Sequence, residues 1–296
     1  MIRRKGPYKK KDIDEMFECC AQDIGKLYDA SRPTPWDTSK KSKLLNIVSC
    51  LNDEKENRNI EDYLAEKILN LKSEKGNGIK ECLKNYFKEN PIKKREKGYV
   101  PEEHRTEDIK FNTEDPRRRE NNIVRLLYKF KGCLNKGSTF KDIFGEIIEY
   151  EVPLAEKGKN NIDMLTKTKE HINIIEWKTD SERCKDSLLR AMLEITTYEY
   201  ELLKGEFIDK FKLDKKKYNE NSFKKIIAIF DKTKPASTYK YIKSKDPEYK
   251  NIAKLLKELD IDVVLLSQDS IVKNITDDTK IEDCKIKAEV LKSADI

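Results

Sequence analysis

The chain has 296 residues, of which 37% are hydrophobic and 40% are charged, and its 62 basic and 55 acidic side chains leave a formal net charge of +7. This length suffices for one large domain or two ordinary ones, and the clustering of apolar residues in short runs excludes a chain that is disordered throughout. The seven cysteines form no Cys-x-x-Cys pair, which argues against zinc and iron–sulfur sites and favours free thiols in a reducing compartment.

Two further features of composition bear on location and partners. No apolar run approaches membrane-spanning length, and no apolar stretch follows the basic start of the chain, so we expect a cytoplasmic protein without membrane association. Basic clusters lie at residues 3–11, 93–97 and 117–119, and such clusters can contact phosphates. A solvated surface explains them as well, so charge alone does not establish a nucleic-acid partner.

The first third of the chain is predicted to be helical. Apolar residues recur at helical spacing in several stretches before residue 90, and the last of these stretches stops at Asn90-Pro91. Residues 91–116 then combine three prolines with many charges and little periodicity. We therefore expect a helical N-terminal region over residues 1–90 and a charged linker over residues 91–116.

Strand-like and helix-like runs alternate after Pro116, in the order α-β-β-β-α-β-α-β. The uninterrupted apolar runs IIAIF and VVLL are typical of strands in a sheet that helices cover on both faces. This order predicts an α/β core over residues 117–270 and a polar C-terminal tail over residues 271–296. The expected strands are Ile147–Leu154, Asn161–Thr166, His171–Lys178, Ile226–Phe230 and Ile261–Leu266, and the main expected helix is Asp186–Leu203.

Polar residues in two of these strands suggest chemistry. Asp163 stands in the apolar run IDML and Glu176 in the run IIEWK, although an acidic residue inside an apolar strand is costly unless its charge is paired or bound to a cation. Alternate strand residues share a face, so Glu176 and Lys178 project together while Trp177 packs on the other side. If the two strands pair, Asp163 can lie beside Glu176. Two converging carboxylates suit Mg²⁺ or Mn²⁺, and a neighbouring ammonium suits phosphodiester hydrolysis.

The Glu-x-Lys triplet has a competing explanation. It occurs twice in the chain, and the second copy, Glu248-Tyr249-Lys250, lies in a polar, turn-like stretch with no strand before it, so we set that copy aside. For the first copy the alternative is an ion pair at a strand end, and for Asp163 it is a turn cap. The joint occurrence on neighbouring strand-like segments favours the functional interpretation.

The run IDMLTKTKEHINIIEWK resembles the core of the PD-(D/E)xK nuclease superfamily, in which one strand carries Asp and the next carries Glu-x-Lys. The resemblance covers roughly residues 117–268 and implies a restriction-endonuclease-like fold with a central mixed β-sheet flanked by helices. It also implies that Asp163, Glu176 and the backbone carbonyl of Trp177 hold Mg²⁺ or Mn²⁺, and that Lys178 positions the attacking water. Ile162 stands where the family often has proline.

The resemblance implies further site residues on two helices. A helix before the sheet often contributes an acid, and Glu120 occupies that place, with Glu146 and Glu151 as alternatives. One branch carries Gln-x-x-x-Tyr in the helix after Glu-x-Lys, near the substrate. Here Tyr198 matches but Glu194 replaces the glutamine, and Tyr198 could equally be a core residue. In the same segment Arg190 is a candidate for phosphate contact, whereas Lys185 better suits a solvated surface.

These observations predict a metal-dependent deoxyribonuclease, as an endonuclease that acts on DNA and works as a homodimer or in a larger complex. The alternative is a catalytically inactive, nuclease-like module that binds nucleic acid or serves as a scaffold. A third possibility is an unrelated α/β interaction protein with a chance motif, which a lack of metal binding would favour.

Overall fold

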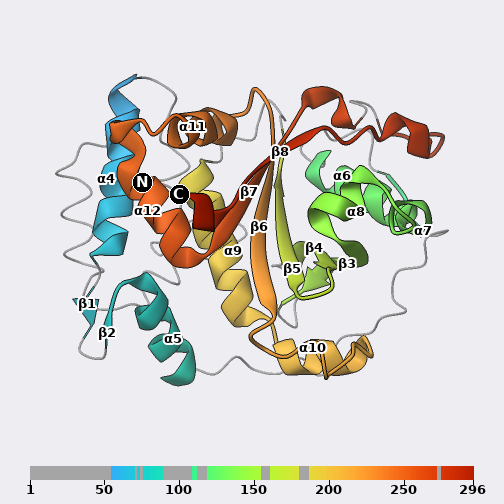
Figure 1. Cartoon of the computed structure of the whole chain (residues 1–296), viewed down its shortest axis with the longest axis horizontal. Helices are drawn as coiled ribbons and strands as arrows, with labels where there is room; N and C mark the ends of the chain where they lie inside the picture. The colour runs from blue at the N-terminus through green and yellow to red at the C-terminus, as the bar shows by residue number, and fades with distance from the viewer. Residues whose placement is uncertain are drawn as a thin grey trace, which may run out of the picture.

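A computed structural model describes residues 55–70, 72–73, 76–89, 109–111, 119–154, 161–179, 187–271 and 275–296 (Figure 1). The helices expected before residue 55, nearly all of the predicted linker, and the basic residues Arg117, Arg118 and Lys185 lie outside these ranges. The candidate site residues all lie inside them.

A six-stranded mixed sheet forms the centre of the molecule, in the order β3-β4-β5-β6-β7-β8. The pairs β5–β6 and β6–β7 are parallel, whereas β3–β4, β4–β5 and β7–β8 are antiparallel. The predicted α/β class is therefore confirmed, and the five strands expected along the chain are present together with a sixth. The strands are β3 (Glu146–Pro153), β4 (Asn161–Lys167), β5 (Ile172–Lys178), β6 (Phe223–Phe230), β7 (Ile261–Leu266) and β8 (Ala288–Leu291).

Helices cover both faces of this sheet, as Figure 1 shows. One face carries α4 (Lys55–Leu69), α9 (Leu188–Glu201), α11 (Lys234–Lys243) and α12 (Lys250–Leu259); the other carries α6 (Arg119–Lys129), α7 (Lys131–Leu134) and α8 (Thr139–Phe144). Two further helices, α5 (Ile79–Glu89) and α10 (Lys204–Lys210), and a small hairpin of β1 (Lys72–Ser73) and β2 (Gly76–Asn77) complete the described α-helices and strands.

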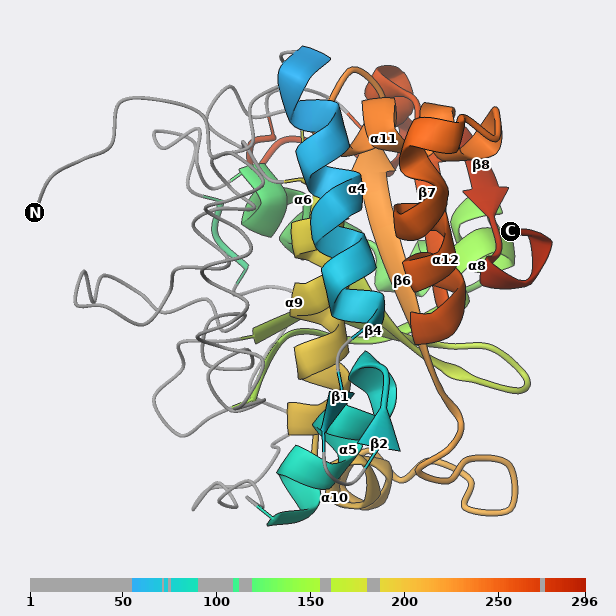
Figure 2. The same cartoon turned by 90° about the vertical axis from the view of Figure 1, so that its left-hand side faces the viewer.

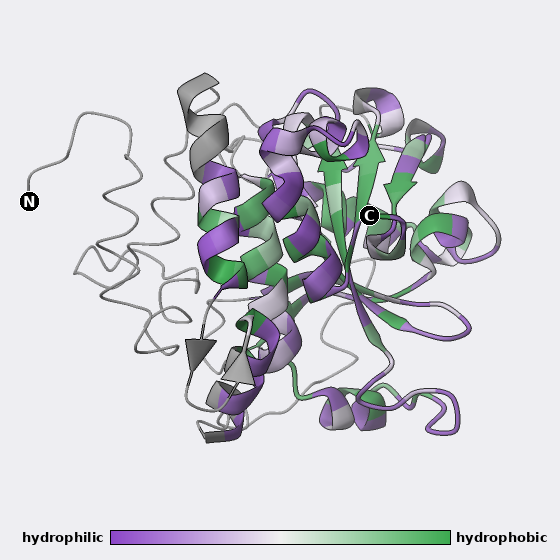
Figure 3. Cartoon of the chain, turned by 60° about the vertical axis from the view of Figure 1, so that its left-hand side comes forward, coloured by the Kyte–Doolittle hydropathy of each residue, from purple (hydrophilic) through white to green (hydrophobic). Residues whose placement is uncertain are grey.

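The central strand β5 shows why the sheet needs two covered faces. All seven of its residues are buried. Ile174 belongs to the hydrophobic core on the α9 side, whereas Ile175 and Trp177 belong to the core on the α6 side. The Trp177 ring lies 5.5 Å from the ring of Phe144 and 6.3 Å from that of Phe230. The apolar strands stand out in Figure 3 among helices with mixed surfaces. Burial of alternate side chains on opposite faces confirms the predicted orientation of Trp177.

The N-terminal helices share the core of the sheet. Leu64 and Ile68 of α4 and Ile79 and Leu83 of α5 are buried in the cluster that includes α9 and α12. Figure 2 shows α4 lying along α12. The described part of the predicted N-terminal region contains α4 and α5 together with the β1–β2 hairpin, and its two helices pack directly against the α/β core.

The C-terminal segment differs from the prediction of a polar tail. Residues 288–291 form β8, which pairs with β7 at one edge of the sheet. This strand has four residues, and Val290, Glu289 and their neighbours are exposed or half-buried. Its sequence AEVL is too short to form the run of alternating residues by which a strand is detected in a sequence. Helix α11 was also absent from the predicted order.

Candidate active site

Asp163 lies where β4 and β5 separate. The antiparallel register pairs Met164 with Ile175 and Leu165 with Ile174, so its continuation by one residue sets Asp163 opposite Glu176. At that point the Trp177 backbone N–H donates a hydrogen bond to Asp163 Oδ2 at 2.8 Å. The hairpin that the sequence predicted thus brings the two acidic residues together.

Glu176 and Lys178 project from β5 toward helix α9. The Lys178 Nζ atom lies 2.7 Å from Glu176 Oε1 and 3.1 Å from Glu194 Oε2. Glu176, Lys178 and Glu194 are only 4%, 3% and 5% exposed. The ammonium is therefore held between a carboxylate of the sheet and a carboxylate of the helix.

The expected acid of the preceding helix also lies at this site. Glu120, in the first turn of α6, accepts a hydrogen bond from the Thr179 backbone N–H at 3.3 Å, and its charge acts on Asp163. The two alternatives to Glu120 have other partners. Glu146 pairs with Lys141 and Lys167, and Glu151 accepts hydrogen bonds from Asn121 and Arg125 of α6.

Helix α9 presents three candidate residues at a spacing of four, which places Arg190, Glu194 and Tyr198 on one face. The Ser187 hydroxyl caps this helix by accepting a hydrogen bond from the Arg190 backbone N–H. Tyr198 is buried, and burial together with the charges of Glu194 and Glu176 raises its pKa. The sequence predicted that Glu194 contacts substrate. In the structure its carboxylate instead faces Lys178, a contact that no sequence pattern indicated.

Negative charge is in excess at this site. The carboxylates of Glu120, Asp163, Glu176 and Glu194 act on one another, and Lys178 is the cation that opposes them. Burial and the nearby Glu120 charge raise the pKa of Asp163 to about 7. Burial and the Asp163 charge raise the pKa of Glu176 well above its ordinary value. A bound cation would reduce this repulsion, because an opposite charge favours the ionised carboxylates.

Two observations indicate that these donor atoms suit a divalent cation. Glu176 Oε2 is buried and has no hydrogen-bond partner, although buried polar atoms are normally satisfied. Asp163 and Glu176 supply hard oxygen ligands, and Mg²⁺ commonly uses one or two carboxylates and keeps several waters. Across the described residues, no group of three or more His, Cys, Asp and Glu side chains is arranged as a complete ligand set. Further ligands would therefore be water or backbone oxygens, such as the Trp177 carbonyl.

Comparisons with known proteins give no match: no protein-family model, no curated protein and no solved structure is significantly similar to this chain. The interpretation of the site therefore depends on its own geometry. Within the described ranges, no helix combines the length and the apolar character needed to cross a membrane.

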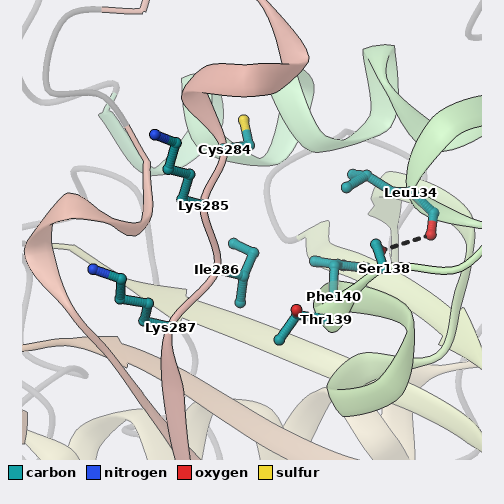
Figure 4. A pocket seen from close by; sticks show the side chains of 8 residues that line it. All are labelled: Leu134, Ser138, Thr139, Phe140, Cys284, Lys285, Ile286 and Lys287. Carbon is teal, nitrogen blue, oxygen red and sulfur yellow. Dashed lines mark hydrogen bonds between the residues drawn. The ribbon is translucent and has the colours of Figure 1, made fainter.

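A separate pocket of 420 Å³ lies between α7–α8 and residues 284–287 (Figure 4). Its apolar part comes from Leu134, Phe140 and Ile286, whereas the Lys285 and Lys287 side chains point away from Leu134 and Phe140. Cys284 belongs to the same lining. None of the eight described lining residues is acidic, so this pocket lacks the carboxylate oxygens that distinguish the site around Asp163.

Proposed function

We propose that the protein is a divalent-metal-dependent nuclease with a restriction-endonuclease-like, PD-(D/E)xK type of active site. The observation that carries this proposal is the placement of half-buried Asp163 beside buried Glu176 and Lys178, in a cluster in which Glu176 Oε2 has no hydrogen-bond partner. Phosphodiester hydrolysis needs a cation at the phosphoryl oxygen and a positive group near the attacking water, and this cluster can supply both.

Each residue has a distinct role in the proposal. Asp163 and Glu176 hold Mg²⁺ or Mn²⁺, with the Trp177 carbonyl as a further oxygen ligand, and Glu120 adds negative charge on the α6 side. When bound, the metal would polarise the phosphoryl oxygen and lower the pKa of a bound water. Lys178 donates hydrogen bonds from its ammonium and thereby orients the water and opposes the charge that develops on the phosphate. Arg190 and Tyr198, on the same face of α9, are the proposed substrate contacts.

The proposed substrate is DNA, and the proposed reaction is internal cleavage. A single active site of this kind cuts one strand at a time, so a homodimer is the simplest arrangement for cutting a duplex. The basic clusters of the sequence are consistent with contacts to the phosphate backbone.

The decisive experiment measures cleavage of labelled single-stranded DNA, double-stranded DNA and RNA in Mg²⁺, Mn²⁺ or EDTA. Wild type would be compared with Asp163→Ala, Lys178→Ala and, as a matched control, Asp231→Ala, whose carboxylate pairs with Lys240 at the protein surface. We expect metal-dependent cleavage that both site variants lose and the control retains. If no substrate is cut, and nucleic-acid binding is unchanged in the site variants, an inactive binding module replaces the nuclease proposal.

A further inference from the structure

The position of Glu194 has a consequence that rests on the proposed nuclease function and goes beyond it. We infer that Glu194 is a positioning residue that holds the Lys178 ammonium at the reacting centre, rather than a residue that contacts substrate or metal. A glutamate at this place differs from the glutamine of the family pattern described above, and the inference follows from its contact with Lys178.

Two buried carboxylates flank the Lys178 ammonium. Lys178 Nζ lies 2.7 Å from Glu176 Oε1 and 3.1 Å from Glu194 Oε2, and these side chains are 4%, 5% and 6% exposed. Breaking one side of a buried ion pair leaves an uncompensated charge, which makes such a contact far more consequential than a surface salt bridge. The position of the Lys178 ammonium therefore depends on both carboxylates.

The two carboxylates, Glu176 and Glu194, are not equivalent. In the proposed function Glu176 also binds the metal, so part of its charge is directed away from Lys178. Glu194 is not among the proposed metal ligands, and its Oε2 atom, which has no hydrogen-bond partner either, faces the Lys178 ammonium at 3.1 Å. When the metal is bound, Glu194 is the carboxylate that can still hold the ammonium, because its full negative charge attracts the ammonium across the 3.1 Å ion pair more strongly than a neutral amide would.

Helix α9, which carries Glu194, is firmly packed. Glu194 lies in the middle of α9, whose residues from 191 to 198 are buried, and its carbonyl accepts a hydrogen bond from the Thr197 hydroxyl at 2.7 Å. Helix α9 packs against β5 and β6. A buried residue on a packed helix can fix the position of a catalytic group more accurately than a residue on a loop.

The test compares Glu194→Gln and Glu194→Ala with Glu199→Gln. Glu199 is a suitable control because it lies on the same helix and its carboxylate is also paired with lysines, Lys225 and Lys204, away from the site. For Glu194→Gln we expect kcat to fall about 10- to 100-fold, the usual effect of removing an outer-shell partner. The KM and the Mg²⁺ affinity, measured by calorimetry, should stay within about threefold of wild type, and Glu199→Gln should keep wild-type kcat.

Three outcomes would overturn the inference. A rise in KM at constant kcat would make Glu194 a substrate contact, and a loss of Mg²⁺ affinity of tenfold or more would make it a metal ligand. An unchanged kcat in both Glu194 variants would show that Glu194 has no role in catalysis.

A second measurement separates this inference from the proposed function. The side-chain ammonium of Lys178 should give a slowly exchanging ¹⁵N–¹H NMR signal in wild type and Glu199→Gln, because a buried, paired ammonium is protected from water. The signal should disappear in Glu194→Gln. If wild type cleaves nothing but this pattern is observed, the nuclease proposal fails while Glu194 still holds Lys178. If the signal persists in Glu194→Gln, Glu194 does not hold the ammonium, whatever the cleavage assay gives.

Discussion

The Trp177 backbone N–H donates to Asp163 Oδ2 at 2.8 Å, so a side chain takes the place of a backbone acceptor where β4 and β5 separate. This hydrogen bond fixes one oxygen of Asp163 and links the orientation of its carboxylate to the strand that carries Glu176 and Lys178. An amide at position 163 could accept the same hydrogen bond without adding to the negative charge of the site.

Asp163→Asn should therefore separate stability from metal binding. Without metal, the variant should unfold at the same temperature as wild type or at a higher one, because one of four mutually repelling carboxylates loses its charge. Saturating Mg²⁺ should stabilise wild type by about 2.7 kcal/mol at a hundredfold excess over the dissociation constant. The variant should show almost none of this increase. Thermal unfolding in EDTA and in Mg²⁺ measures both effects.

Asp231→Asn is the control for that experiment, since Asp231 pairs with Lys240 near the surface. It should keep the stabilisation by Mg²⁺. A Mg²⁺-dependent rise in unfolding temperature that survives in Asp163→Asn would contradict the assignment of Asp163 as a metal ligand.

Mg²⁺ affinity should depend on pH because burial, and next the Glu120 charge, raise the pKa of Asp163 to about 7. Below that pH the metal must displace a proton from Asp163, so the affinity should fall at least about tenfold for each pH unit. The raised pKa of Glu176 makes the Mg²⁺ affinity fall with falling pH in the same way. Calorimetric titrations with Mg²⁺ between pH 5 and pH 8 would show the slope, and a pH-independent affinity would contradict it.

The same pKa shift has a definite sign for the stability of the metal-free protein. The ordinary pKa of Asp163 is 3.8, and its folded value is higher, so the folded state binds more protons between about pH 4 and pH 7. Stability should therefore fall as pH rises through this window. The difference in unfolding free energy between wild type and Asp163→Asn, measured in EDTA, isolates this contribution from other groups; a difference that does not change with pH would show that Asp163 does not titrate there.

The sequence predicts well those features that follow from local periodicity. Strands β3, β4, β5 and β7 lie within two residues of their predicted bounds, and the Asp163–Glu176 juxtaposition follows from a tight hairpin and a period of two. Features that depend on long-range contacts were not predictable. Strand β8 has only four residues and forms by pairing with the edge of β7, which no local pattern indicates. The Glu194–Lys178 contact depends on how α9 packs across the sheet, which no local sequence pattern specifies.

Gly145 offers a test of the turn between α8 and β3. Its φ angle is +88°, and a Cβ atom there would lie 2.4 Å from the Lys167 carbonyl oxygen, so Gly145→Ala combines backbone strain with a clash. We expect a loss of at least about 1–3 kcal/mol in the free energy of unfolding. Gly132→Ala is the matched control, because a Cβ at position 132 meets nothing within 4 Å. Denaturant titration should show little change or a slight stabilisation for this control, and an equal loss in both variants would refute the argument.

Glu61 and Asp62, which are adjacent on α4, cap two different helices. They allow a test of whether a disturbance at the start of α9 changes the active site. Glu61 accepts a hydrogen bond from the Leu189 N–H at the start of α9, at 3.3 Å. Asp62 accepts hydrogen bonds from the Asn251 and Ile252 N–H groups at the start of α12, at 2.8 Å and 3.0 Å. Replacement of either residue by alanine should cost about 1–2 kcal/mol of stability, as the loss of a helix cap does.

The two variants should differ in activity because only α9 carries Glu194. Glu61→Ala should lower kcat several-fold at a temperature where the protein is fully folded, since a small shift of α9 moves the carboxylate that holds Lys178. Asp62→Ala should keep wild-type kcat despite a stability loss at least as large, because it loses hydrogen bonds from two backbone groups and from the Asn251 side chain. Chemical denaturation combined with the cleavage assay measures both quantities. Equal losses of kcat in the two variants would mean that α4 affects the site only through overall stability.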